Sequence, residues 1–508
     1  MEDKEKWMEK FFDIYIQIND YILKKSENEE LTFIDHYMFQ ATSYLISILH
    51  DNLLLKEQSY NKCFIYRSLI EVITIMKMYL AGDVPTDAEE LINSYNYIAE
   101  YNIYKRYKSV LDKKEFNFEE IENNFKNTKS MYREVLNDIN SSKFKDLLNS
   151  KLPFLKDDFT FDSLIQKYSP GFYSTYRILS VMVHPNDLLL TVDFLGSIEF
   201  EVLEANIHLV VFDIIKKCYL NVKLSSTKTL REEISLISSN EINNLYLNMA
   251  TAQKKTLFKL ADMIEEKHNE NTQSILFREL GKAVESMAID KTFGFNEIVK
   301  CKFKIVIEML ALNYYISTLP HNLEDQFLEE LVTKHTRLKL MEIYGIDQKE
   351  KLEDAYKCYM NYDKNISFEE FKKKFFKSLG FVPGDISITK FVFNFIDALT
   401  KDNQDFGNHM KMVYDESQFL SHANGYMISS NSGAFMDYSS VIIFTDVCIE
   451  YIIELYYNRY KLYNESKGEH KYNKFIYDLN KCLKDYKKYA KIKNETDYKF
   501  KDFKVNYK

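Results

Sequence analysis

Two apolar stretches of the chain each carry a basic residue and a glutamate four residues apart, and no other feature limits the fold as strongly. The stretches read CFIYRSLIEVITIMKMYL and CKFKIVIEMLALNYYI, and they contain Arg67 with Glu71 and Lys304 with Glu308. Each stretch is apolar on nearly all sides, which predicts a buried helix. Because ionised groups are seldom buried without partners, each pair is expected to form an internal ion pair that ties helices together or to line a polar pocket.

The composition favours helices throughout the chain. Glycine (12) and proline (6) are scarce in 508 residues, whereas tyrosine (38) and phenylalanine (37) are abundant. Turn-rich β folds need glycine and proline at their turns. A content of 46% hydrophobic and 28% charged residues is typical of globular proteins and excludes a disordered chain. We therefore expect an all-α protein with more than one core.

The spacing of two histidines downstream of the apolar stretches predicts an internal duplication. His184 follows Glu71 after 113 residues, and His422 follows Glu308 after 114 residues. An amphipathic segment precedes each apolar stretch, and an apolar segment closes each copy. The sequence therefore predicts two tandem helical bundles related by duplication. The predicted division is a first bundle at 1–225, a linker at 226–240, a second and degenerate bundle at 241–460, and a basic tail at 461–508.

The tail differs in charge from the rest of the chain. Residues 459–508 hold 15 basic residues, 7 acidic residues and eight tyrosines, although the whole chain has a net charge of −9. Basic residues interleaved with aromatic rings suit phosphate contact and base stacking. We expect a helical tail that either packs on the acidic body or binds nucleic acid.

Cysteine placement and hydropathy limit the cofactors and the location. The six cysteines show no C-x-x-C spacing, so neither a zinc ribbon nor a disulfide framework is predicted. Glu204 and His208 have helical ligand spacing but no third ligand, so we expect no metal and no other cofactor. The N-terminus lacks the pattern of an export signal, and apolar runs such as 206–215 and 441–453 are shorter than a membrane span. A cytoplasmic protein without a membrane partner is expected.

The candidate chemistry lies around Arg177 and His184. Seven residues make nearly two helical turns, so both side chains project from one face of a helix. Pro185 disfavours the helical conformation at His184, which places the imidazole near a helix end. A guanidinium that binds phosphate beside a histidine that moves protons suits metal-independent phosphodiester cleavage.

The segment from Arg177 to His184 resembles the R-x(4–6)-H motif of the HEPN superfamily, helical domains found in many prokaryotic ribonuclease toxins and defence proteins. The resemblance implies a cleft between two HEPN units, in which the arginine and the histidine cleave RNA through attack by the neighbouring 2′-hydroxyl. This chain departs from the pattern at Ile178, where a polar residue often follows the arginine. The second copy has Asp415 where an arginine is wanted, although His422 is present.

The chain is also similar to an uncharacterised bacterial family of all-helical domains. That likeness supplies no activity, but it implies which side chains meet. The residues that carry it are Arg67, Glu71, Tyr176, Leu179, Ser180 and His184 in the first copy, and Glu308, Tyr414, Leu420, Ser421 and His422 in the second.

Two functions follow as hypotheses. The first is a HEPN-like ribonuclease in a toxin or phage-defence setting, with Arg177 binding the scissile phosphate, His184 as acid and base, and Arg67 with Glu71 orienting them. The second copy would complete the site through Lys304, Glu308, Tyr414 and His422. The alternative is a non-catalytic binding or regulatory module that recognises a protein or small ligand in a defence complex. The expected partners are accordingly RNA, a protein, or a second copy of the chain.

Overall fold

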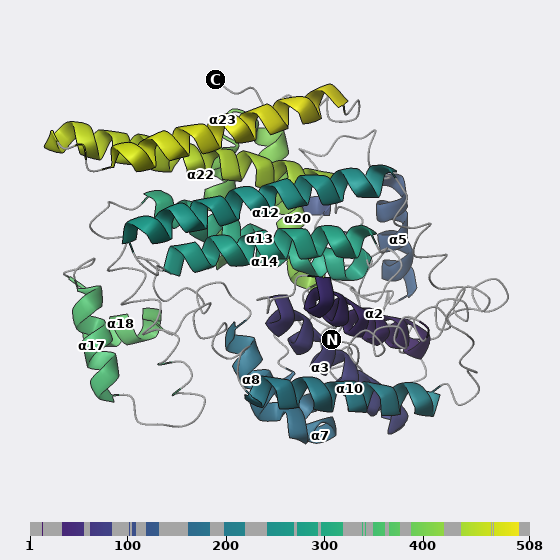
Figure 1. Cartoon of the computed structure of the whole chain (residues 1–508). Helices are drawn as coiled ribbons and strands as arrows, with labels where there is room; N and C mark the ends of the chain where they lie inside the picture. Colours follow the sequence, from purple (N-terminus) through teal and green to yellow (C-terminus); the bar gives the residue numbers. More distant parts are fainter. Residues whose placement is uncertain are drawn as a thin grey trace.

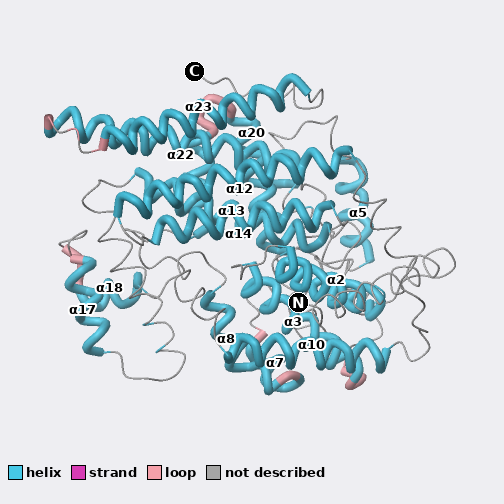
Figure 2. The backbone as a smooth tube through the Cα atoms, viewed as in Figure 1, coloured by secondary structure: helices cyan, strands magenta, loops and turns pink. Residues whose placement is uncertain are grey.

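The structure is a computed structural model, and its described segments are helices joined by turns and loops. Figure 2 shows no strand in these segments, so the all-α prediction is confirmed for them. The described residues are 33–54, 61–83, 104–107, 118–131, 161–182, 198–218, 241–268, 272–292, 296–318, 349–360, 365–375, 388–420, 438–468 and 472–496, with Asp13, Tyr101, Leu338, Met341 and His470 as single positions.

The first half of the chain is organised around helix α3, whose residues from Asn61 to Met76 are all buried. Helices α2, α7, α8 and α10 all pack against α3. The helices of this half are α2 (Phe33–Leu54), α3 (Asn61–Leu80), α5 (Phe118–Met131), α7 (Asp162–Tyr168), the 3-10 turn η2 (Pro170–Phe172), α8 (Tyr173–Met182) and α10 (Ile198–Cys218). The predicted linker 226–240 lies outside the described residues.

The second half is organised around helix α14 in the same way. Helices α13, α19, α20 and α22 pack against α14, in the same chain order as α2, α7, α8 and α10 around α3. The helices are α12 (Glu241–His268), α13 (Thr272–Thr292), α14 (Asn296–Thr318), α17 (Lys349–Tyr359), α18 (Phe368–Phe375), α19 (Ile388–Leu399), α20 (Gln404–Leu420), α22 (Tyr438–Lys467) and α23 (Asn473–Thr496). A duplication would produce this matched order, and the duplication itself stays a prediction that superposition of the halves tests.

A buried polar group joins the two halves where α2 and α3 contact α14. The Ser47 hydroxyl of α2 donates to Asp290 Oδ1 at 3.0 Å, and Lys302 Nζ lies 2.5 Å from Asp290 Oδ2. Lys302 also donates to Ser286. Neither Lys302 nor Asp290 is exposed to solvent. We call Ser47, Ser286, Asp290 and Lys302 the inter-half lock.

The described part of the tail is helical and packs against other helices of the protein. Helix α22 runs past residue 460 to Lys467, and α23 then returns along α22 and α12 (Figure 1). The Tyr486 hydroxyl donates to Asp446 Oδ1 at 2.6 Å, and Leu479 is fully buried. The expected packing of the tail on the body is thus observed for α23 as far as Tyr486.

A glycine marks the end of α3 and an asparagine marks the start of α20, two of the helices that carry the candidate site. Gly82 follows α3 with a φ of 76°, and its N–H donates to the carbonyl of Tyr79 while Asp83 N–H donates to that of Met78. This is the glycine-terminated motif that closes a helix. At the start of α20, Asn403 Oδ1 accepts from the backbone N–H of Phe406 and caps the helix. None of the described helices has an apolar run sufficient to cross a lipid bilayer.

Candidate functional site

The first cluster consists of Arg67, Glu71 and Tyr176, and it joins α3 to α8. The Tyr176 hydroxyl donates to Glu71 Oε1 at 2.8 Å, and Arg67 Nη2 lies 3.3 Å from the same oxygen. The Arg67 guanidinium also lies over the Tyr176 ring, with its central carbon 5.7 Å from the ring centroid. Glu71 has no exposed surface. The carboxylate is therefore held by internal partners and has no direct route to a substrate.

The second cluster consists of Lys304, Glu308 and Tyr414, and it joins α14 to α20. The Tyr414 hydroxyl donates to Glu308 Oε1 at 2.9 Å. All three residues are buried. The two tyrosine–glutamate bonds span 105 and 106 residues of sequence. The same link between an apolar helix and a later helix is thus present in both halves.

The two clusters influence each other electrostatically. Burial lowers the pKa of Lys304, and the positive charge of Arg67 lowers it further, against the opposing effects of Glu308 and Glu71. Burial also acts to lower the pKa of Arg67, but the negative charge of Glu71 and the interaction with the Tyr176 hydroxyl outweigh it and raise that pKa. Burial and the charge of Arg67 therefore disfavour the protonated, charged form of Lys304.

Tyr44 of α2 lies between the two halves beside these clusters. Its hydroxyl is 3.5 Å from Cys301 Sγ, and the Cys301 thiol donates to the carbonyl of Leu420 at 2.9 Å. Burial, Cys301 and Glu71 all raise the pKa of Tyr44, so the phenol stays neutral. This hydrogen bond from the Cys301 thiol holds Leu420, the last described residue of α20, against α14.

Arg177 lies on a different side of α8 from the first cluster. Successive helical residues are about 100° apart, so the turn of Tyr176 toward Glu71 directs Arg177 away from it. The central carbon of the Arg177 guanidinium is 5.9 Å from the centroid of the Tyr173 ring, and Arg177 is partly exposed. Arg67 and Glu71 thus contact Tyr176, whereas the hypothesis from the sequence had them orient Arg177 and His184. His184 and His422 lie outside the described residues.

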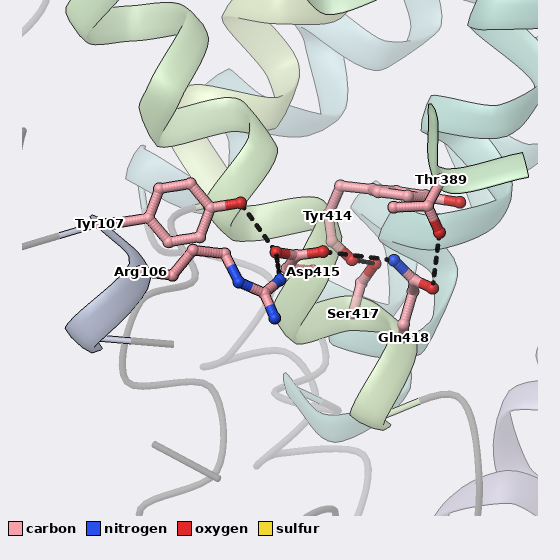
Figure 3. Close-up of polar contacts among 7 residues, drawn as sticks. All are labelled: Arg106, Tyr107, Thr389, Tyr414, Asp415, Ser417 and Gln418. Carbon is pink, nitrogen blue, oxygen red and sulfur yellow. Dashed lines mark hydrogen bonds and ion pairs between the residues drawn. The ribbon is translucent and has the colours of Figure 1, made fainter. Parts of the chain in front are cut away.

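Asp415 takes part in a contact that sequence reasoning missed. Arg106 Nη1 pairs with Asp415 Oδ2, and the Tyr107 hydroxyl donates to the same oxygen at 2.7 Å. Figure 3 shows both side chains pointing at Asp415 from a segment of the first half, while Gln418 approaches from α20 itself. The run of basic and aromatic residues at 104–108, YKRYK, was the available signal.

Metal ligation finds no support in the described residues. Glu204 accepts a hydrogen bond from the Tyr66 hydroxyl at 2.8 Å and lies 3.8 Å from Lys62 Nζ, which commits its carboxylate to α3. No group of three or more histidine, cysteine, aspartate or glutamate side chains is placed to hold a metal ion in the part of the chain that the structure describes.

Comparison with known proteins adds no relative. No protein-family model matches the chain, and neither the curated proteins nor the solved structures contain a match.

Proposed function

We propose that the chain is a metal-independent ribonuclease of the HEPN type, acting in the cytoplasm in a toxin or phage-defence setting. The observation that supports this proposal best is the placement of two consecutive residues of α8, one anchored in the core and one partly exposed. Tyr176 anchors the helix to buried Glu71, while the next residue, Arg177, stays partly exposed. In this proposal the first cluster positions α8, and Arg177 with His184 meets the RNA.

The proposed step is an internal transesterification. His184 removes the proton of a ribose 2′-hydroxyl, and the oxygen attacks the adjacent phosphorus while Arg177 binds the phosphate oxygens. The bond from phosphorus to the 5′-oxygen breaks, and that oxygen takes up the proton that His184 removed from the 2′-hydroxyl. The products are a 2′,3′-cyclic phosphate and a free 5′-hydroxyl, so the step consumes no water and no metal.

The test is degradation of RNA by the purified full chain in the presence of a chelator. Wild type should produce ends that carry a cyclic phosphate, and His184→Ala should be slower by about 10²-fold or more, the scale of general acid–base catalysis. Arg177→Ala should also lose activity. His470→Ala is a matched control, because His470 is an exposed histidine in the turn before α23.

Thermal unfolding of each variant separates chemistry from structure. A catalytic His184 leaves the melting temperature unchanged when it is replaced. Equal cleavage by wild type and His184→Ala would refute the assignment to this site.

A non-catalytic binding or regulatory module is the second candidate, and the burial of both clusters away from solvent favours it. Glu71 and Glu308 are 0% and 2% exposed, so an incoming partner does not reach them unless helices separate. Recognition would then use the surface, where α10 exposes Val202 and Leu209. Intact RNA after incubation with wild type, with no chelator present, would favour this candidate over the ribonuclease.

A further inference from the structure

The two halves differ in charge at one corresponding position. Arg177 follows Tyr176 in α8, and Asp415 follows Tyr414 in α20, while both tyrosines bind the glutamate of their own half. Each of these positions precedes a histidine by seven residues. The second half thus carries a carboxylate where the first carries a guanidinium.

A guanidinium nevertheless reaches this position from elsewhere in the chain. Arg106 pairs with Asp415 across 309 residues of sequence. The short segment that carries it is anchored on α5, because the Tyr101 ring stacks on Phe125 with centroids 3.7 Å apart and the Tyr104 hydroxyl donates to Glu122 at 2.9 Å. The segment is therefore held on α5 through Tyr101 and Tyr104. The Arg106 side chain is held on α20 through Asp415.

The pair is arranged with the carboxylate inside and the guanidinium outside. The side chain of Asp415 is 5% exposed and that of Arg106 is 58% exposed. Asp415 contacts Arg106 through one nitrogen, Nη1, and a guanidinium has five N–H donors in a planar fork suited to phosphate. Its neighbour Lys105 is also exposed. The carboxylate thus orients the guanidinium, and more than half of the Arg106 side chain remains exposed to solvent.

We propose that Arg106, held by Asp415 and Tyr107, is the phosphate-binding arginine of the second half, in place of an arginine at position 415. Its ligand is a phosphate of single-stranded RNA. This inference rests on the proposed function, since it assigns a residue that binds the same substrate.

The test measures binding separately from cleavage. A fluorescent RNA with 2′-O-methyl riboses cannot react by the proposed step, so anisotropy titrations report affinity alone. Arg106→Ala should bind it about 10-fold more weakly, as expected for the loss of a charge-assisted contact, and the slope of affinity against salt should fall by about 0.7 for one lost phosphate contact. Lys357→Ala is the control, since it removes an exposed cation on α17.

A second pair of variants removes the effect of a buried unpaired carboxylate. Asp415→Asn keeps Arg106, and Asp415→Asn combined with Arg106→Ala does not, so their comparison should show the same 10-fold difference. Affinities within twofold in both comparisons, or no measurable binding by wild type, would overturn the inference.

Cleavage of unmodified RNA by the same samples tests the ribonuclease separately. Binding that depends on Arg106 without cleavage would refute the ribonuclease and keep the inference. Cleavage by wild type with unchanged binding by Arg106→Ala would refute only the inference.

Discussion

A tyrosine hydroxyl in each half of the chain donates to a glutamate that is almost inaccessible to water. Tyr176 binds Glu71 and Tyr414 binds Glu308, and each glutamate has a basic residue four positions before it. A buried carboxylate that loses a donor remains charged and desolvated, which costs more than an ordinary hydrogen bond. These hydroxyls therefore contribute to stability whatever the chain binds.

Replacing either hydroxyl should destabilise the protein. Tyr176→Phe and Tyr414→Phe should each lower the free energy of unfolding by about 1.5–3 kcal/mol, the range for hydrogen bonds to charged groups. Urea unfolding measures the change. Tyr477→Phe, at a tyrosine that is 68% exposed, should change it by less than about 0.5 kcal/mol. If the two buried variants match this control, the bonds do not stabilise the fold.

The lowered pKa of Lys304 predicts a dependence of stability on pH. Below the ordinary lysine pKa of about 10.4, the unfolded chain binds this proton more fully than the folded chain does, so stability rises with pH. Wild type should therefore gain stability relative to Lys304→Met as pH rises toward that value. Unfolding of both proteins from about pH 7 to about pH 9.5, below the ordinary tyrosine pKa of about 10, measures the difference. A constant difference would contradict the lowered pKa.

At the scale of elements, the apolar helices were the part that the sequence predicted well. The apolar stretch 63–80 lies within α3 (Asn61–Leu80), and 301–316 lies within α14 (Asn296–Thr318). Their continuous apolar character and the charged pairs within them are features of the local sequence. The contact of Arg106 with Asp415 is not such a feature, because it joins residues 309 apart and depends on how the halves pack.

Helix α23 tests the structural role of the tail. Leu479 is fully buried and Tyr477 is 68% exposed on the same helix. Leu479→Ala should therefore lower the free energy of unfolding by about 2–5 kcal/mol, whereas Tyr477→Ala should change it by less than about 0.5 kcal/mol. Chemical denaturation of the full chain measures both. Equal effects would mean that α23 does not pack as described.

At the scale of the whole molecule, the halves are joined by buried charge as well as by apolar contact. The sequence predicted two bundles and the pairs within each, but no local pattern marked Lys302 and Asp290 as partners of Ser47. Likewise, the sequence indicated Arg177 as a candidate. It did not indicate that Tyr176 faces Glu71 and that Arg177 therefore points away from the first cluster. Such relations depend on tertiary packing rather than on spacing.

The inter-half lock should respond differently to single and paired replacement. Lys302→Met leaves Asp290 buried without its cation and should cost about 3–5 kcal/mol. Adding Asp290→Leu removes the uncompensated charge and should recover most of this loss, since apolar replacement of a buried pair is often neutral. Denaturant unfolding of wild type, the single variant and the double variant provides the comparison. A double variant that is less stable than the single one would contradict the expected coupling.

The inter-half lock also bears on how the protein folds during its synthesis. Ser47 and its partner Asp290 are 243 residues apart, and chains grow at about 5–20 residues per second. For roughly 10–50 seconds after Ser47 is synthesised, therefore, Asp290 of α13 has not yet been made. During that interval the nascent first half exposes a surface that the finished protein buries, and faster synthesis of the second half shortens this exposure.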